Sequence, residues 1–107
     1  GWLSKSEQLS LAHQCLAVYP EPPNKTNLLP HMGQVSGIWE GGGKALNDLR
    51  WATLGFQYDW TARTYPEDQR GVVPSEIQAI AEGAVAATRC AARAIQAEAV
   101  IVNFYHP

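Results

Sequence analysis

The feature that most constrains the fold is the apolar segment at residues 97–107, which reads A-E-A-V-I-V-N-F-Y-H-P. Residues 100–102 are β-branched, and a short run of this kind is typical of a buried strand. Because side chains alternate across a strand, Asn103 and Tyr105 are expected on one face at its end. The segment therefore predicts a strand that carries a small-ligand site.

The sequence stops directly after this strand, so we expect it to be the front part of a larger protein. Its 107 residues are enough for one domain but not for two. With 46% hydrophobic and 17% charged residues, it is typical of a globular chain. No apolar run approaches the roughly 20 residues of a membrane span, so no membrane partner is expected. The net charge of −2 means that any binding of nucleic acid must come from local clusters.

Two helices are predicted from capping signals. A capping box at Ser4 and Glu7 predicts a helix over residues 5–19, whose wide apolar stripe should pack against another element. A second box, S-E-I-Q, predicts a helix over residues 75–92 with an alanine-rich inner face. Residues 20–43, with prolines at the head and three glycines at the tail, are expected to form an irregular connection.

A strand and an aromatic loop are predicted between the two helices. Alternating side chains over residues 51–58 favour a strand, in which Gly55 indicates a bulge or a close backbone approach. The polar loop that follows carries Trp60 and Tyr65, interleaved with arginines that could hold a phosphate while the rings stack on a base. Aromatic residues in a loop can equally anchor it to the core, and the sequence favours this simpler interpretation.

Motifs of a complete catalytic centre are absent from the sequence. It contains no H-x-D, H-E-x-x-H or G-x-S-x-G motif, and its histidines are scattered. Cys15 and Cys90 lack C-x-x-C spacing, which favours two reduced thiols over a disulfide or a metal site. We therefore predict no catalytic residue and no metal ligand within these 107 residues.

The predicted pieces follow one another in a distinctive order. Residues 49–60 read L-R-W-A-T-L-G-F-Q-Y-D-W, a tyrosine follows in a polar loop, V-P-S-E-I begins a helix, and residues 98–105 read E-A-V-I-V-N-F-Y. This order resembles the AlkB family of iron(II)- and 2-oxoglutarate-dependent dioxygenases, and within it the branch of AlkB homologue one. The opening helix followed by Y-P-E-P-P-N-K-T-N-L also resembles that branch's N-terminal extension.

The resemblance implies an α+β fold in which N-terminal helices pack on the first strands of an incomplete double-stranded β-helix, or jelly roll. Residues 1–44 would be the N-terminal helix and extension, and residues 45–107 the start of the dioxygenase domain. The family's iron ligands, an H-x-D beyond the N-x-Y of this strand and a later histidine, are not among these residues. His106 does not have the spacing to serve as one of them.

The resemblance also implies roles for particular side chains. Asn103 and Tyr105 would donate hydrogen bonds to the carboxylate end of 2-oxoglutarate, a task that suits an amide and a phenol. A lid would recognise a flipped, methylated base by aromatic stacking. Tyr58 and Tyr65 match aromatic positions of this lid, and Trp60 and Arg63 lie near them in the sequence, so these four residues are expected to bind the substrate.

The activity implied by the resemblance is oxidative demethylation of N-methylated bases in DNA or tRNA, with formaldehyde released, as in DNA repair or tRNA modification. Iron(II) and 2-oxoglutarate would be the cofactor and the cosubstrate of the full-length protein, while these 107 residues alone are expected to be inactive. The resemblance also implies an intracellular location, whether nuclear, cytoplasmic or mitochondrial. The alternative is a non-enzymatic α+β interaction module whose Trp39, Trp51 and Trp60 are core or partner anchors.

Overall fold

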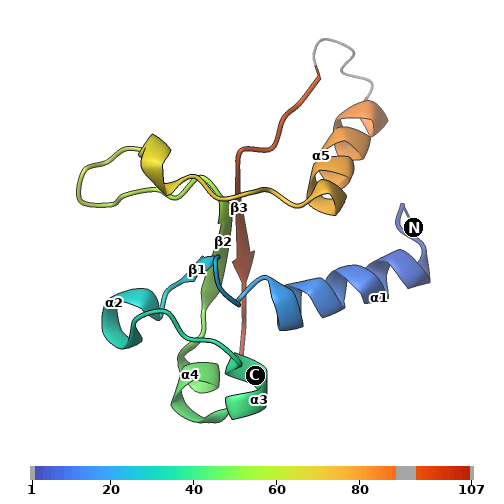
Figure 1. Cartoon of the computed structure of the whole chain (residues 1–107). Coiled ribbons are helices and arrows are strands. Elements are labelled where there is room, and N and C mark those ends of the chain that lie inside the picture. Colours follow the sequence, from blue (N-terminus) through green and yellow to red (C-terminus); the bar gives the residue numbers. More distant parts are fainter. Residues whose placement is uncertain (1, 89–93, 107) are drawn as a thin grey trace. The chain divides into compact units, whose positions relative to one another are not determined.

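The structure, a computed structural model, describes residues 2–88 and 94–106 (Figure 1). In chain order its elements are α1 (Lys5–His13), a π-helical segment (Gln14–Val18), β1 (Lys25–Thr26), α2 (Leu29–Met32), α3 (Ile38–Gly41), α4 (Gly43–Asp48), β2 (Trp51–Gly55), a 3-10 turn (Glu67–Gln69), α5 (Ser75–Ala87) and β3 (Ala99–Asn103). The predicted α+β class is confirmed, whereas the jelly roll stays a prediction. The chain divides into two compact units, residues 1–53 with 101–107 and residues 54–100.

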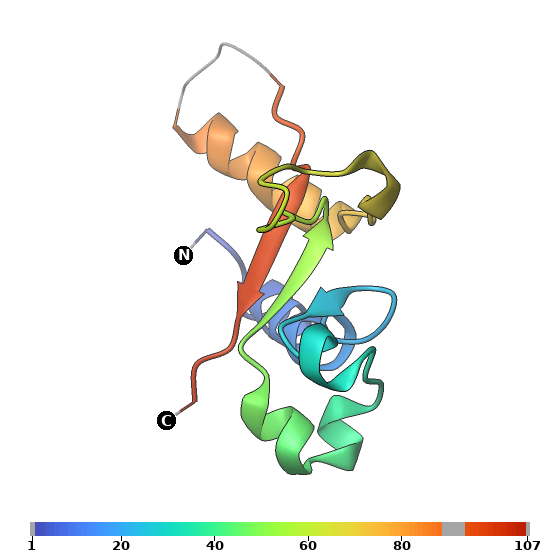
Figure 2. The ribbon, with the colours of Figure 1, turned by 90° about the vertical axis from the view of Figure 1, so that its left-hand side faces the viewer.

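The strands form one sheet in the order β1-β2-β3. β1 and β2 are antiparallel, with Lys25 opposite Thr53. β2 and β3 also run in opposite directions (Figure 2). At one end of the pair the Phe104 N–H donates to the Arg50 carbonyl, and at the other end the Phe56 N–H donates to the Glu98 carbonyl, each at 2.8 Å.

Only one face of β3 is covered. Val100 and Val102 are partly buried, whereas Ala99, Ile101 and Asn103 are exposed. The prediction of a buried strand is therefore wrong, because three of its five side chains are exposed and the other two are only partly buried. Apolar runs predict strands that are covered on both faces, but antiparallel sheets can leave one face in solvent.

The core of the first unit contains Leu28, Ile38 and Leu49, each at most 2% exposed. Residues packed around them include Met32, Val35, Ala45, Leu46 and Phe104. Two of the three core residues lie in the stretch predicted to be an irregular connection, so that prediction is wrong. Its elements, β1, α2 and α3, have only two to four residues each, too few to show a sequence period.

Asn27 ties the end of α4 to the start of β2. Its Oδ1 accepts hydrogen bonds from the N–H groups of Arg50 (2.7 Å) and Trp51 (3.1 Å), and its Nδ2 donates to the Asp48 carbonyl (2.9 Å). A further bond joins the Asn27 N–H to the Trp51 carbonyl at 3.2 Å. One side chain therefore satisfies backbone groups that a helix end and a strand start would otherwise leave unpaired.

The first capping box is confirmed. The Ser4 N–H donates to Glu7 Oε2 at 2.7 Å, and the Glu7 N–H donates to Ser4 Oγ at 3.2 Å. Hydrogen bonding to Ser4 lowers the pKa of the Glu7 carboxyl below its usual range. The α-helix ends at His13, and the chain continues to Val18 as a π-helix rather than as the predicted α-helix.

The predicted packing of this first helix is wrong for most of its stripe. All of α1 is at least partly exposed, Leu9 is 72% exposed, and Leu16 and Val18 are exposed as well. Tyr19 follows the π-helical segment directly and is buried, with 2% exposure. It is the residue through which this stretch contacts the core.

The second capping box does not form. Ser75 is the first residue of α5 rather than its cap, and Pro74 precedes it without a side-chain cap. Gln78, the expected reciprocal partner, instead bonds to residues 95–97. The helix ends at Ala87, and the predicted extension as far as residue 92 falls partly outside the described residues. Among the helices that are described, none has the length and apolar character needed to cross a bilayer.

Candidate functional site

Four rings gather in the loop after β2, and we call Phe56, Tyr58, Trp60 and Tyr65 the aromatic cluster. The Tyr58 ring lies edge-on to Trp60, with ring centres 4.8 Å apart, and at 5.1 Å from Tyr65. Phe56 meets Tyr65 edge-on at 6.5 Å. Edge contacts of this kind are favourable because they bring positive ring edges against negative ring faces. Tyr58 and Tyr65 are thus the two inner rings of the cluster, and Phe56 and Trp60 are its ends.

A tight turn brings the rings together. Asp59 and Thr64 pair through two backbone hydrogen bonds of 2.8 and 3.3 Å. The Asp59 carboxylate accepts the N–H groups of Thr61 (2.8 Å) and Ala62 (2.9 Å), as in an Asx turn. Arg63 completes the turn with φ of 54°, a left-handed conformation that is uncommon for a residue with a side chain.

The outer ring of the cluster is open to solvent. Trp60 is 79% exposed, while Tyr58 is partly buried beneath it. The Arg70 guanidinium lies 4.7 Å from the centre of the Phe56 ring, in a cation–π contact. The structure therefore brings Tyr58, Trp60 and Tyr65 together and places Arg63 in the turn that joins them. Phe56 and Arg70 complete the group, and the sequence pattern did not single out Phe56 because it reads as the continuation of a strand.

The end of β3 presents the two residues expected to bind the cosubstrate. Asn103 and Tyr105 are both exposed, Tyr105 by 89%, and Phe104 between them is partly buried and packs on the core of the first unit. Both side chains are therefore exposed, although β3 itself ends at Asn103 and Tyr105 lies two residues beyond it. His106 has a structural contact instead, since its Nε2 lies 3.0 Å from the Leu49 carbonyl oxygen.

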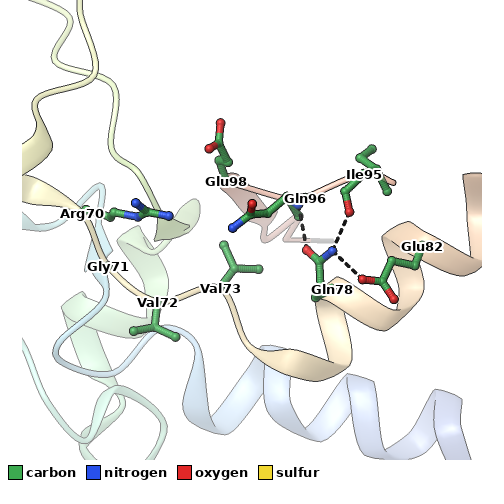
Figure 3. A pocket seen from close by; sticks show the side chains of 10 residues that line it. Arg70, Gly71, Val72, Val73, Gln78, Glu82, Ile95, Gln96 and Glu98 are labelled. Atoms are coloured by element: carbon green, nitrogen blue, oxygen red, sulfur yellow. Dashed lines mark hydrogen bonds between the residues drawn. The ribbon is translucent and has the colours of Figure 1, made fainter. Parts of the chain in front are cut away.

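A hollow of about 510 Å³ lies in the second unit between α5 and the segment leading to β3 (Figure 3). Gln78 organises one wall, because its Nε2 donates to the Ile95 carbonyl (2.7 Å) and to Glu82 Oε1 (2.9 Å), while its Oε1 accepts the Ala97 N–H (2.7 Å). Arg70 and Glu98 also line the hollow. The sequence pattern did not predict this hollow, because its walls come from segments far apart in the chain.

The described residues hold no group of three or more histidine, cysteine or acidic side chains that could bind a metal ion. Cys15 is a free, half-buried thiol, and burial raises its pKa above the usual range. Cys90 lies outside the residues that the structure describes.

Comparison with known proteins gives several relatives, although no protein-family model matches the chain. It is 34% identical over 108 residues to the nucleic acid dioxygenase ALKBH1 of Mus musculus and 32% identical to that of Homo sapiens, alignments that cover 86% of this chain. It is also 34% identical over 112 residues to the tRNA demethylase abh1 of Schizosaccharomyces pombe, which covers 81% of this chain. The chain spans 27% of the length of the two mammalian relatives and 37% of the yeast one.

Proposed function

Because the chain belongs to the AlkB family, we propose that it is part of an iron(II)- and 2-oxoglutarate-dependent dioxygenase that demethylates N-methylated bases in nucleic acid. The observation that carries this proposal is the similarity over 86% of the chain to proteins named nucleic acid dioxygenases. A relative named tRNA demethylase supports the same class of substrate. Because the chain spans 27% of the length of the mammalian relatives, the activity is proposed for the full-length protein.

Asn103 and Tyr105 are proposed to hold the cosubstrate. An amide and a phenol are both hydrogen-bond donors, and their exposure at a strand end suits a small dicarboxylate. Among the described residues no cluster fits the iron, so its ligands are proposed to lie in other parts of the full-length protein. Iron and 2-oxoglutarate would supply the oxidising chemistry that removes the methyl group. The role of Asn103 and Tyr105 is to bind and orient the cosubstrate.

The aromatic cluster is proposed to receive the substrate base. Trp60 offers a ring that is 79% exposed, and its edge contact with Tyr58 fixes its position. Stacking of a base on an aromatic side chain is worth about 1–3 kcal/mol and tolerates any base, because every base has a π-face. Arg63, in the turn beside Trp60, is suited to hold a neighbouring phosphate.

An interaction module is the second candidate. Trp39 is 43% exposed in the first unit and Trp60 is 79% exposed in the second, and exposed tryptophans are frequent partner anchors. This candidate predicts that both tryptophans contribute to binding a protein and that neither affects an oxidation reaction.

Removing the proposed cosubstrate contacts should raise the KM for 2-oxoglutarate. In the full-length protein, Asn103→Ala and Tyr105→Phe are each expected to raise it about ten- to a hundredfold, since a hydrogen bond to a charged group is worth about 1.5–3 kcal/mol. Formaldehyde release from a methylated oligonucleotide, measured over a range of 2-oxoglutarate concentrations, gives the KM.

Ile101→Ala is the matched control, because Ile101 is exposed on the same face of β3 as Asn103 and neither residue of the substitution carries a donor. Its KM should stay at the wild-type value. A wild-type protein that neither demethylates the oligonucleotide nor gains thermal stability from iron and 2-oxoglutarate would contradict the proposed function.

Trp60→Ala should weaken binding of the nucleic acid without affecting the cosubstrate. We expect the Kd for a single-stranded, methylated oligonucleotide to rise about tenfold, because one stacking contact is lost. Fluorescence anisotropy of a labelled oligonucleotide measures the Kd. Trp39→Ala is the matched control and should leave it unchanged, whereas equal effects of the two substitutions would argue against a stacking role for the aromatic cluster.

A further inference from the structure

A second hollow, of about 320 Å³, lies in the first unit between α2, α4 and the start of β2. Leu28 and Met32 form its apolar part, and its charged lining consists of His31, Lys44, Asp48 and Arg50. We call this the basic hollow. None of its residues belongs to the aromatic cluster or to the proposed cosubstrate site.

Positive charge exceeds negative charge in the basic hollow. Lys44 forms an ion pair with Asp48, although the lysine side chain is still 78% exposed. A hydrogen bond from Lys44 lowers the pKa of the Asp48 carboxyl, and the nearby charges of Lys44, Arg50 and His31 lower it further. One carboxylate therefore faces two permanent cations and an imidazole. This local surplus contrasts with the net charge of −2 of the whole chain.

Arg50 is held in place before any ligand arrives. Its Nη1 donates to the carbonyls of Asn47 (2.6 Å) and Leu49 (3.0 Å). Its backbone N–H is held by Asn27 Oδ1 at 2.7 Å. A guanidinium has five N–H donors, and in the part of the chain that the structure describes Arg50 forms its side-chain hydrogen bonds through Nη1. The donors on Nε and Nη2 can therefore serve an anion without the ordering cost of a free surface arginine.

We propose that the basic hollow binds a phosphodiester group of the nucleic-acid backbone. Arginine and lysine are the side chains that most often contact such phosphates, and these contacts position a nucleic acid without reading its sequence. The apolar part formed by Leu28 and Met32 suits the sugar next to the phosphate. The proposal rests on the proposed function, and it adds an anchoring point for the strand in a unit other than that of the aromatic cluster.

The test compares charge variants of opposite sign in the full-length protein. The double variant Lys44→Gln, Arg50→Gln should weaken binding of a single-stranded oligonucleotide about tenfold and reduce the slope of log K against log salt by about 0.7, because the contact to one phosphate is lost. Asp48→Asn should strengthen binding about three- to fivefold, because it removes a negative charge beside the phosphate. Lys5→Gln, an exposed charge at the start of α1, is the control.

Each outcome decides the matter. The proposal is supported if the double variant weakens binding and Asp48→Asn strengthens it. These shifts in affinity should be equal for two unrelated oligonucleotide sequences and absent for Lys5→Gln. If the wild-type protein demethylates nucleic acid but all charge variants bind it equally, the basic hollow is not a backbone site and the proposed function stands. If the variants lose binding only of inorganic phosphate, the site takes the free anion and the proposal fails. Melting temperatures show whether Arg50→Gln unfolds the protein. If it does, Lys44→Gln alone replaces the double variant.

Discussion

Gly55→Ala is expected to lower the free energy of unfolding of the full-length protein by about 3 kcal/mol or more. Gly55 has φ of 77°, and a Cβ placed there would lie 2.2 Å from the Glu98 carbonyl oxygen and 2.7 Å from a methyl carbon of Val73. The carbonyl is fixed by its hydrogen bond to the Phe56 N–H, so neither side can give way easily. Urea unfolding of the purified protein measures the loss.

Gly43→Ala separates the two causes of this loss, which are the backbone strain of a positive φ and the clash of the added Cβ with its neighbours. Gly43 also has a positive φ, 65°, but a Cβ there would meet nothing within 4 Å. We expect this control to cost only the backbone strain, about 1 kcal/mol. Equal losses for the two variants would show that the close approach to Glu98 contributes nothing.

Leu49→Ala is expected to destabilise the full-length protein by about 3 kcal/mol, within the 2–5 kcal/mol typical of buried leucines. Leu49 is 1% exposed and belongs to the same core cluster as Leu28 and Ile38. Because the surrounding residues come from short elements tied by hydrogen bonds, they cannot collapse fully into the cavity. The midpoint and slope of urea unfolding give the change in free energy.

Leu9→Ala is the matched control, since it makes the same chemical change on the exposed face of α1. With Leu9 72% exposed, we expect a change of no more than about 0.5 kcal/mol. A loss for Leu9→Ala as large as that for Leu49→Ala would contradict the exposure of α1 in the full-length protein.

The sequence was most informative where a pattern is local. The Ser4 and Glu7 capping box depends on residues three apart, and the alternation from Trp51 to Leu54 depends on neighbours in one strand, so both could be predicted. The predicted continuation of this strand to residue 58 is wrong, because β2 ends at Gly55. The core positions Leu28 and Ile38 could not, because each lies beside a helix or strand too short to show a period. The second capping box failed because Gln78 is used instead by a long-range contact with residues 95–97.

In the candidate sites, too, features that depend on neighbouring residues could be predicted from the sequence, and features that depend on distant residues could not. The exposure of Asn103 and the partial burial of Val102 follow the alternation of a single strand, whereas Tyr105 lies beyond the last residue of β3. The cation–π contact between Arg70 and Phe56 joins positions that no periodicity relates. The basic hollow depends on Asn27 folding back on residues 48–51, a tertiary contact that only the structure reveals.

The division of the chain into two units has a consequence for its synthesis. Phe104 packs on the core built by residues 28–49, its N–H bonds to Arg50, and His106 contacts Leu49. The first unit is thus completed by residues that leave the ribosome after the whole of the second unit has been translated. On a translating ribosome, the core around Leu28, Ile38 and Leu49 therefore lacks the Phe104 side chain until the second unit has been translated.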